Sequence, residues 1–230
     1  MSVDLKLAGE VALEEARRIF LTDIWDPPTS YRHGEAERWR DAITEMIKSD
    51  LGLGWSWEDR YAGDGDYEWC GAFVSRCWSR GGVKLSERKT YFSSCFRLRA
   101  WASYKQANEV VKNPKPAEGP WRMIVALNEK SGDVQFPDGT GPRAGDILLV
   151  GGVNTGPGKH VTLVEKFDER KREFLTYEGN ARGVGPDGKK RQGVVRARRP
   201  FGLPLGAEET TYHARWLIRP APSDLAVEKD

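Results

Sequence analysis

Cys70 is the residue of this 230-residue sequence best placed to act as a nucleophile. It begins the run "CGAFVSRCW", in which apolar side chains recur at helical spacing, and Gly81 and Gly82 follow as a stop signal. The unpaired N–H groups and the dipole of a helix start stabilise a thiolate, which is the nucleophilic form of cysteine. A structural role is the alternative, because free cysteines often serve as small buried residues.

A cysteine nucleophile needs a base within hydrogen-bond reach, and histidine is the usual one because its pKa lies near neutrality. Of the three histidines, we expect His33 to lie in a surface loop and His213 to be structural. His160 begins a predicted strand directly after the loop "GGVNTGPGK", so its ring can stand where a substrate has access. The loop itself lacks the spacing of a phosphate-binding loop, and we expect no cofactor.

A histidine base also needs an acceptor that holds its second ring nitrogen. The predicted strand at 173–180 ends in "TYEGN", and strand alternation places Glu178 and Asn180 on one face with Thr176. If this strand pairs with the preceding one through a tight turn, its end lies beside His160. Glu178 or Asn180 could then reach the imidazole. A polar strand end that faces solvent is the alternative.

The elements that must position these residues follow an α+β order, with helices first and strands afterwards. Apolar periodicity and turn residues predict helices at Cys70 and at 10–20, 35–48 and 91–106. Short segments rich in β-branched and aromatic residues predict an antiparallel meander of about five strands, at 146–150, 160–167, 173–180, 194–199 and 213–219. Residues 121–136 carry no clear pattern.

At 230 residues the chain fits one large domain or one domain with an appendage. We expect a single domain at residues 1–220, with an inserted region at about 84–140 and a frayed tail at 221–230. A net charge of +2 gives no reason to expect nucleic acid. Three cysteines without a Cys-x-x-Cys spacing exclude a zinc ribbon or a disulfide framework. The N-terminal segment has no signal-peptide core, so we expect synthesis in the cytoplasm and no membrane insertion.

Four segments together resemble the CHAP group of papain-like amidases and endopeptidases, which cut peptidoglycan: "WCGAFV", "AGDILLV", "HVTLVE" and "YEGN". The resemblance covers residues 10–180 in element order, and the region at 84–140 departs from the compact family core. It implies a papain-like fold with Cys70 as the nucleophile, His160 as the base, Glu178 as the orienting carboxylate and Asn180 as an auxiliary polar residue. It also implies a thioester intermediate.

The tetrahedral oxyanion of such a reaction needs hydrogen-bond donors, and the backbone N–H of Cys70 is the nearest one available. Tyr67 is our first candidate for a second donor, with Tyr61 behind it, and Trp69 is a candidate for contacting the substrate. Asp64 and Asp66 do not match the calcium-binding loop of some CHAP members in position. We interpret them as a turn and expect no metal.

Three functions follow from these patterns. The first is a cysteine amidase or endopeptidase that acts on peptidoglycan, and the second keeps the chemistry but acts on a protein or a small-molecule amide. The third is a binding module that has the fold without the chemistry. For a wall hydrolase without a signal peptide, we expect delivery by phage lysis, by a phage tail or by specialised secretion, with an export machine or an immunity protein as partners.

Overall fold

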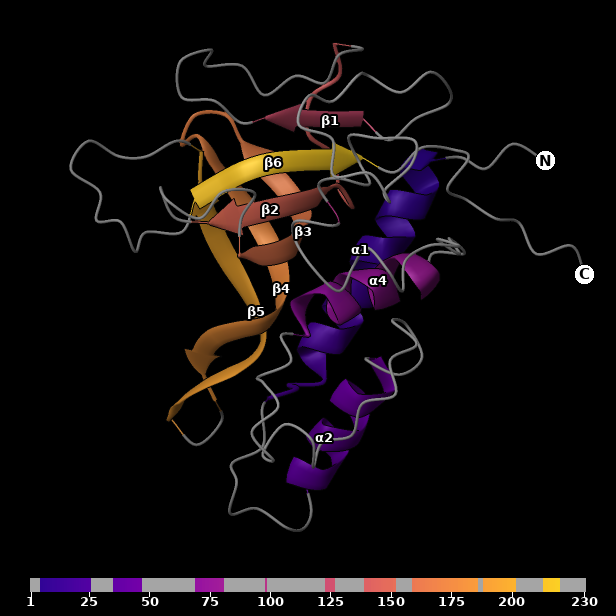
Figure 1. The fold of residues 1–230 in the computed structure, drawn as a ribbon, viewed down its shortest axis with the longest axis vertical. Helices are drawn as coiled ribbons and strands as arrows, with labels where there is room; N and C mark the ends of the chain where they lie inside the picture. Colours follow the sequence, from indigo (N-terminus) through magenta and orange to yellow (C-terminus); the bar gives the residue numbers. More distant parts are fainter. Residues whose placement is uncertain are drawn as a thin grey trace, which may run out of the picture.

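The computed structural model describes eight stretches of the chain and the single residue Leu98. The stretches are 5–25, 35–46, 69–80, 123–126, 139–151, 159–185, 188–201 and 213–219. Over these residues the protein is α+β, as the order of the sequence patterns predicts. Helices cover one face of an antiparallel sheet (Figure 1).

The helices are α1 (Leu5–Leu21), α2 (Glu35–Glu45) and α4 (Cys70–Arg80). In α1 the buried residues Ala8, Ala12, Ala16 and Ile19 repeat at three and four residue spacing and form the face that packs against the rest of the molecule. The three corresponding predictions are confirmed, although α1 begins earlier than expected. The helix predicted at 91–106 lies outside the described residues except for Leu98, which is helical and buried.

The sheet has six strands in the order β1-β6-β2-β3-β4-β5, and every neighbouring pair is antiparallel. All five predicted strands are present. The full set is β1 (Met123–Ala126), β2 (Ile147–Gly151), β3 (His160–Asp168), β4 (Glu173–Val184), β5 (Lys190–Pro200) and β6 (His213–Arg219).

The predicted meander is correct for β2 to β5 and wrong for the last strand. Strand β6 does not continue beyond β5 but returns to lie between β1 and β2. Its residues Leu217 and Ile218 are fully buried, as suits a strand with neighbours on both sides. The sixth strand, β1, falls within residues 121–136, for which we made no prediction. It pairs with β6 from Met123 opposite Arg219 to Ala126 opposite Trp216.

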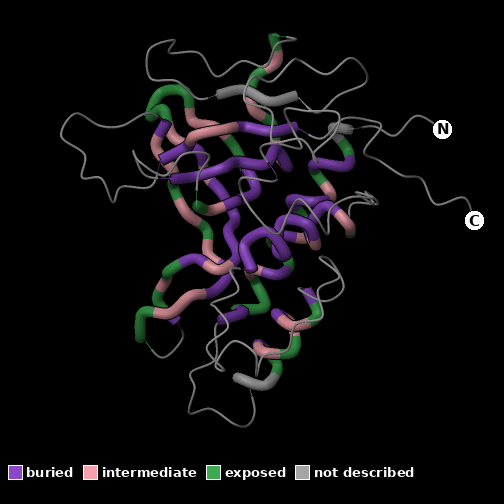
Figure 2. The backbone as a smooth tube through the Cα atoms, viewed as in Figure 1, coloured by how far each residue is buried: buried purple, intermediate pink, exposed green. Residues whose placement is uncertain are grey.

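Apolar side chains fill both faces of the sheet. Strand β2 alternates between them: Ile147 and Leu149 join the cluster under the helices, whereas Leu148 and Val150 join a smaller cluster on the opposite face. The buried positions therefore run through the centre of the sheet and along the helix faces that meet it (Figure 2). A bridge between Phe201 and Ala214 brings the end of β5 to β6, so the sheet curls around the smaller cluster.

A buried ion pair fixes the relation between β2 and β6. Arg219 donates from Nε to Oδ1 of Asp146 and from Nη2 to Oδ2, both at 2.8 Å. The two residues are 5% and 2% exposed. Two parallel hydrogen bonds between a guanidinium and a carboxylate fix the relative orientation of the two groups as well as adding binding energy. The pair therefore holds the residue before β2 against the last residue of β6.

The single domain at residues 1–220, with its inserted region and its frayed tail, stays a prediction. Most of the inserted region at 84–140 and the whole tail at 221–230 lie outside the described residues. Within the described part of the chain, no helix combines the length and apolar character needed to cross a membrane.

Candidate active site

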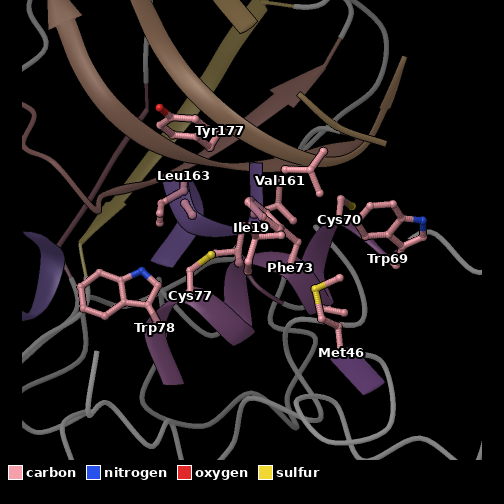
Figure 3. Close-up of a cluster of buried hydrophobic side chains, with 14 of the residues drawn as sticks. Ile19, Met46, Trp69, Cys70, Phe73, Cys77, Trp78, Val161, Leu163 and Tyr177 are labelled. Carbon is pink, nitrogen blue, oxygen red and sulfur yellow. The ribbon is translucent and has the colours of Figure 1, made fainter. Parts of the chain in front are cut away.

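Cys70 is the first residue of α4, the position that the helical pattern predicts. The carbonyl of Trp69 accepts the first hydrogen bond of the helix from the N–H of Phe73 at 3.0 Å, so the N–H of Cys70 has no partner within the helix. Cys70 lies at the margin of the core beside Trp69 and Val161 (Figure 3) and is 5% exposed. Cys77 lies deeper in the same cluster and is fully buried, as suits a structural cysteine.

The hairpin of β3 and β4 brings the imidazole and the carboxylate together. The two strands pair from Asp168 opposite Glu173 back to Leu163 opposite Tyr177. This register places the start of β3 beside the part of β4 that follows Tyr177. As a result, Nε2 of His160 lies 3.1 Å from Oε2 of Glu178. The side chain of His160 is also hydrogen-bonded to Cys70.

These contacts decide the charge of the imidazole. Burial alone lowers the pKa of His160, but its hydrogen bonds to Cys70 and Glu178 outweigh burial and raise that pKa to about 10. The ring is therefore an imidazolium at neutral pH.

Glu178 is fully buried, and its two oxygens accept four hydrogen bonds. Oε1 accepts from the hydroxyl of Thr176 at 2.6 Å and from Nε of Arg199 at 2.7 Å. Oε2 accepts from His160 and from Nη2 of Arg199. The expected sharing of one face by Thr176 and Glu178 is thus confirmed. Four bonds fill the acceptor capacity of a carboxylate, so Glu178 is suited to orienting the imidazole.

The hydrogen bonds also decide the charge of Glu178. Burial alone raises the pKa of this carboxyl, but the bonds from His160 and Arg199 reverse the effect and lower the pKa to about 2. Hydrogen bonds therefore link the sulfur, the imidazolium, the carboxylate and the guanidinium in that order.

Arg199 is the residue that our sequence reasoning missed. It lies near the end of β5, in the run "RARRP", and its side chain is 20% exposed. Antiparallel pairing of consecutive strands would have placed this run beside β4. Nothing in the sequence separates Arg199 from Arg196 and Arg198, however, and these pair instead with Glu165 and Glu173.

Gly179 allows β4 to approach the start of α4 closely. A Cβ atom at this position would lie 2.4 Å from Cβ of Phe73 and 2.8 Å from Cζ3 of Trp69. Since Phe73 and Trp69 flank Cys70 on the helix, this contact sets the separation between the helix start and the strand end that carries Glu178.

We predict that Gly179→Ala lowers the free energy of unfolding by about 1–3 kcal/mol, because overpacking forces side chains or backbone apart. Gly141→Ala is the matched control, because a Cβ there meets no atom within 4 Å, and it should change stability by less than about 0.5 kcal/mol. Urea denaturation followed by circular dichroism measures both. Equal stability of the two variants would contradict the close approach.

Asn180 lies next to this group but is not part of its hydrogen-bond chain. The register of β4 and β5 shifts between Glu178 and Ala181, and Asn180 within this bulge has a positive φ of 57°. Asparagine tolerates this left-handed conformation better than most residues. Its Oδ1 is buried and has no hydrogen-bond partner among the described residues. Asn180 and His160 line the same cavity.

The remaining predicted residues are placed as follows. Trp69 is fully buried and packs against Gly179, which favours a packing role over the substrate contact that we expected. Tyr61, Tyr67, Asp64 and Asp66 lie outside the described residues, as do His33 and Cys95. His213 is buried at the start of β6.

Within the described stretches, no group of three or more His, Cys, Asp or Glu side chains could hold a metal ion. The residues that do converge are a cysteine at a helix start, a charged imidazole and a carboxylate whose acceptor positions are all occupied by hydrogen bonds. This arrangement has the parts for nucleophilic attack and proton transfer. Comparison of the chain with family models, with curated proteins and with solved structures finds no match.

Proposed function

We propose that this protein is a cysteine-dependent hydrolase that cuts amide bonds in peptidoglycan, as an N-acetylmuramoyl-L-alanine amidase or as an endopeptidase of the stem peptide or cross-bridge. The observation that carries the chemistry is the continuous hydrogen-bonded series Cys70, His160, Glu178. Its members come from segments that are far apart in the sequence, and a merely structural role does not require a histidine between a cysteine and a buried carboxylate.

In the proposed reaction, the sulfur of Cys70 forms a bond to the amide carbonyl carbon. The oxyanion that develops accepts a hydrogen bond from the backbone N–H of Cys70 at the start of α4. The His160 imidazolium then gives its proton to the amide nitrogen as the carbon–nitrogen bond breaks, which releases an amine and leaves a thioester.

Hydrolysis of the thioester returns the enzyme to its starting state. The neutral His160 removes a proton from a water molecule as its oxygen attacks the thioester carbon. The carbon–sulfur bond breaks, a carboxylic acid leaves, and the thiolate and the imidazolium are restored. Throughout, Glu178 stays ionised and keeps the ring oriented, because Thr176 and Arg199 hold both of its oxygens.

The choice of peptidoglycan as substrate, and of a papain-like fold, is supported by the resemblance of four segments to the CHAP group. These segments carry Cys70, the β2 strand, His160 and the "YEGN" sequence with Glu178 and Asn180. The described structure has a cysteine at the start of an early helix, followed by a histidine and a glutamate on adjacent strands, and this order supports the resemblance.

Mass spectrometry of digestion products tests this proposal. Purified peptidoglycan is incubated with the protein, and the soluble fragments are compared with those from an incubation without protein. We expect fragments with new amino groups at one defined position of the stem peptide or at its link to the sugar. Release of peptides from an unfolded protein substrate, with an unchanged wall, would instead favour the second function, a hydrolase of protein amides.

A further inference from the structure

A cavity of about 460 Å³ opens beside His160. Its wall is formed by residues at the start of β3, in the second half of β4 and on β5, chiefly Lys159, His160, Asn180, Arg182, Gln192 and Arg199. Arg182 and Gln192 are directly paired between β4 and β5, so their side chains share one face of this hairpin. The cavity therefore adjoins the imidazole and extends away from it along the hairpin.

Besides the His160 imidazolium, which is bonded to Glu178, the described lining of this cavity has three cationic side chains and no carboxylate. The positive charge of Arg199 is balanced by the Glu178 carboxylate, to which it donates two hydrogen bonds. Lys159 and Arg182 are exposed, and neither forms an ion pair with a described carboxylate. Lys159 and Arg182 are therefore two cations of the described lining whose charge no described carboxylate balances. A concave surface with charges of one sign attracts and orients ligands of the opposite sign.

Asn180 adds a second requirement. Its Oδ1 is buried and receives no hydrogen bond from the part of the chain that the structure describes. A buried acceptor in that state costs free energy until a ligand supplies a hydrogen bond. The left-handed backbone of Asn180 fixes this side chain at the bulge, next to the cations. The cavity wall therefore offers cations for an anion and an oxygen for an N–H group. An amino-acid residue with a free carboxylate carries both groups.

We infer that this cavity is a subsite for a carboxylate-bearing residue next to the amide that is cut. Lys159 and Arg182 bind the carboxylate, and Oδ1 of Asn180 accepts a hydrogen bond from a peptide N–H of the same ligand. This inference rests on the proposed function and narrows its substrate to wall peptides whose carboxyl group is free. Peptides in which that group is a carboxamide are poor ligands, because they cannot neutralise the two cations.

Binding to the Cys70→Ala variant tests the subsite without catalysis. The probes are two synthetic stem-peptide fragments that differ only in whether their carboxyl groups are free or converted to carboxamides. By titration calorimetry, we expect the free acid to bind at least about tenfold more tightly, the value of one charge-assisted hydrogen bond. Further replacement by Lys159→Gln and Arg182→Gln should reduce this preference to less than about twofold.

The matched control is Lys166→Gln with Arg170→Gln, which removes the same charge at exposed positions near the other end of β3. It should leave the preference unchanged. Equal binding of the two probes, no binding of the free acid, or an equal loss in the control would overturn the subsite. Tighter binding of a phosphorylated fragment than of the free acid would overturn the choice of carboxylate.

The two proposals fail in different ways. If only the subsite inference is wrong, the wild-type protein cuts both probes at similar rates. Failure of the proposed function would leave the binding preference in place but with no cleavage of either probe. In the wild-type protein, the Lys159→Gln and Arg182→Gln pair should raise KM about tenfold for the free acid and leave kcat within about twofold, because neither residue contacts the reacting atoms.

Discussion

Replacement of Cys70 by alanine is expected to reduce amide hydrolysis by about a thousandfold or more, to the rate of the background reaction. Without the sulfur no thioester forms, and the remaining members of a triad that acts as a unit give little catalysis on their own. The measurement is the rate of amine release from purified peptidoglycan. Cys70 is buried at the first turn of α4, and alanine is a good helix former, so the fold should persist.

Cys77→Ala is the control for this prediction. Cys77 lies on the same helix and is buried, but it packs among apolar residues of the core. Its replacement should leave turnover within a few-fold of wild type. Activity of Cys70→Ala within tenfold of wild type would remove the sulfur from the mechanism. Alkylation by iodoacetamide gives a second readout, since reaction at Cys70 should become slower in His160→Ala.

Glu178→Gln is expected to lower kcat by about 10²–10⁴-fold while the protein remains folded. Glutamine has nearly the same size, but it cannot stabilise the imidazolium, and it offers His160 either a weaker acceptor or a competing donor. The control is Glu173→Gln, also on β4, because Glu173 pairs with Arg198 of β5 and does not contact the imidazole. An equal loss of kcat in both variants would contradict an orienting role for Glu178.

The same variant should change the pH dependence of stability. The pKa of Glu178 is lowered from 4.5 to about 2, so the stability it contributes is present above pH 4.5 and is lost as the pH falls towards 2. The pKa of His160 is raised from 6.5 to about 10, so its contribution is present below pH 6.5 and is lost as the pH rises towards 10.

The difference in free energy of unfolding between wild type and Glu178→Gln should therefore be largest between pH 4.5 and 6.5 and should shrink on both sides. Chemical denaturation at a series of pH values measures it, and Glu173→Gln again provides the control. A difference that stays constant from pH 3 to pH 10 would mean that the two charges do not stabilise one another.

The sequence by itself determined the local features of this protein. Periodicity at three and four residues predicted α1 and α4, and the apolar run that begins at Cys70 placed this residue in the first turn of a helix. The approach of Glu178 to His160 was also predictable, because a short turn joins β3 to β4 and an antiparallel hairpin then sets which residues face one another. Such features depend on neighbours that are close along the chain.

Only the tertiary structure decided the features that depend on distant segments. The return of β6 between β1 and β2, the burial of Trp69 against Gly179 and the contact of Cys70 with His160 require segments far apart in sequence to pack together. The choice of Arg199 among three nearby arginines follows from the strand register and from the fully buried Glu178, which needs a charged partner. Burial and pairing across the whole fold stabilise these arrangements, and local propensity does not encode either of them.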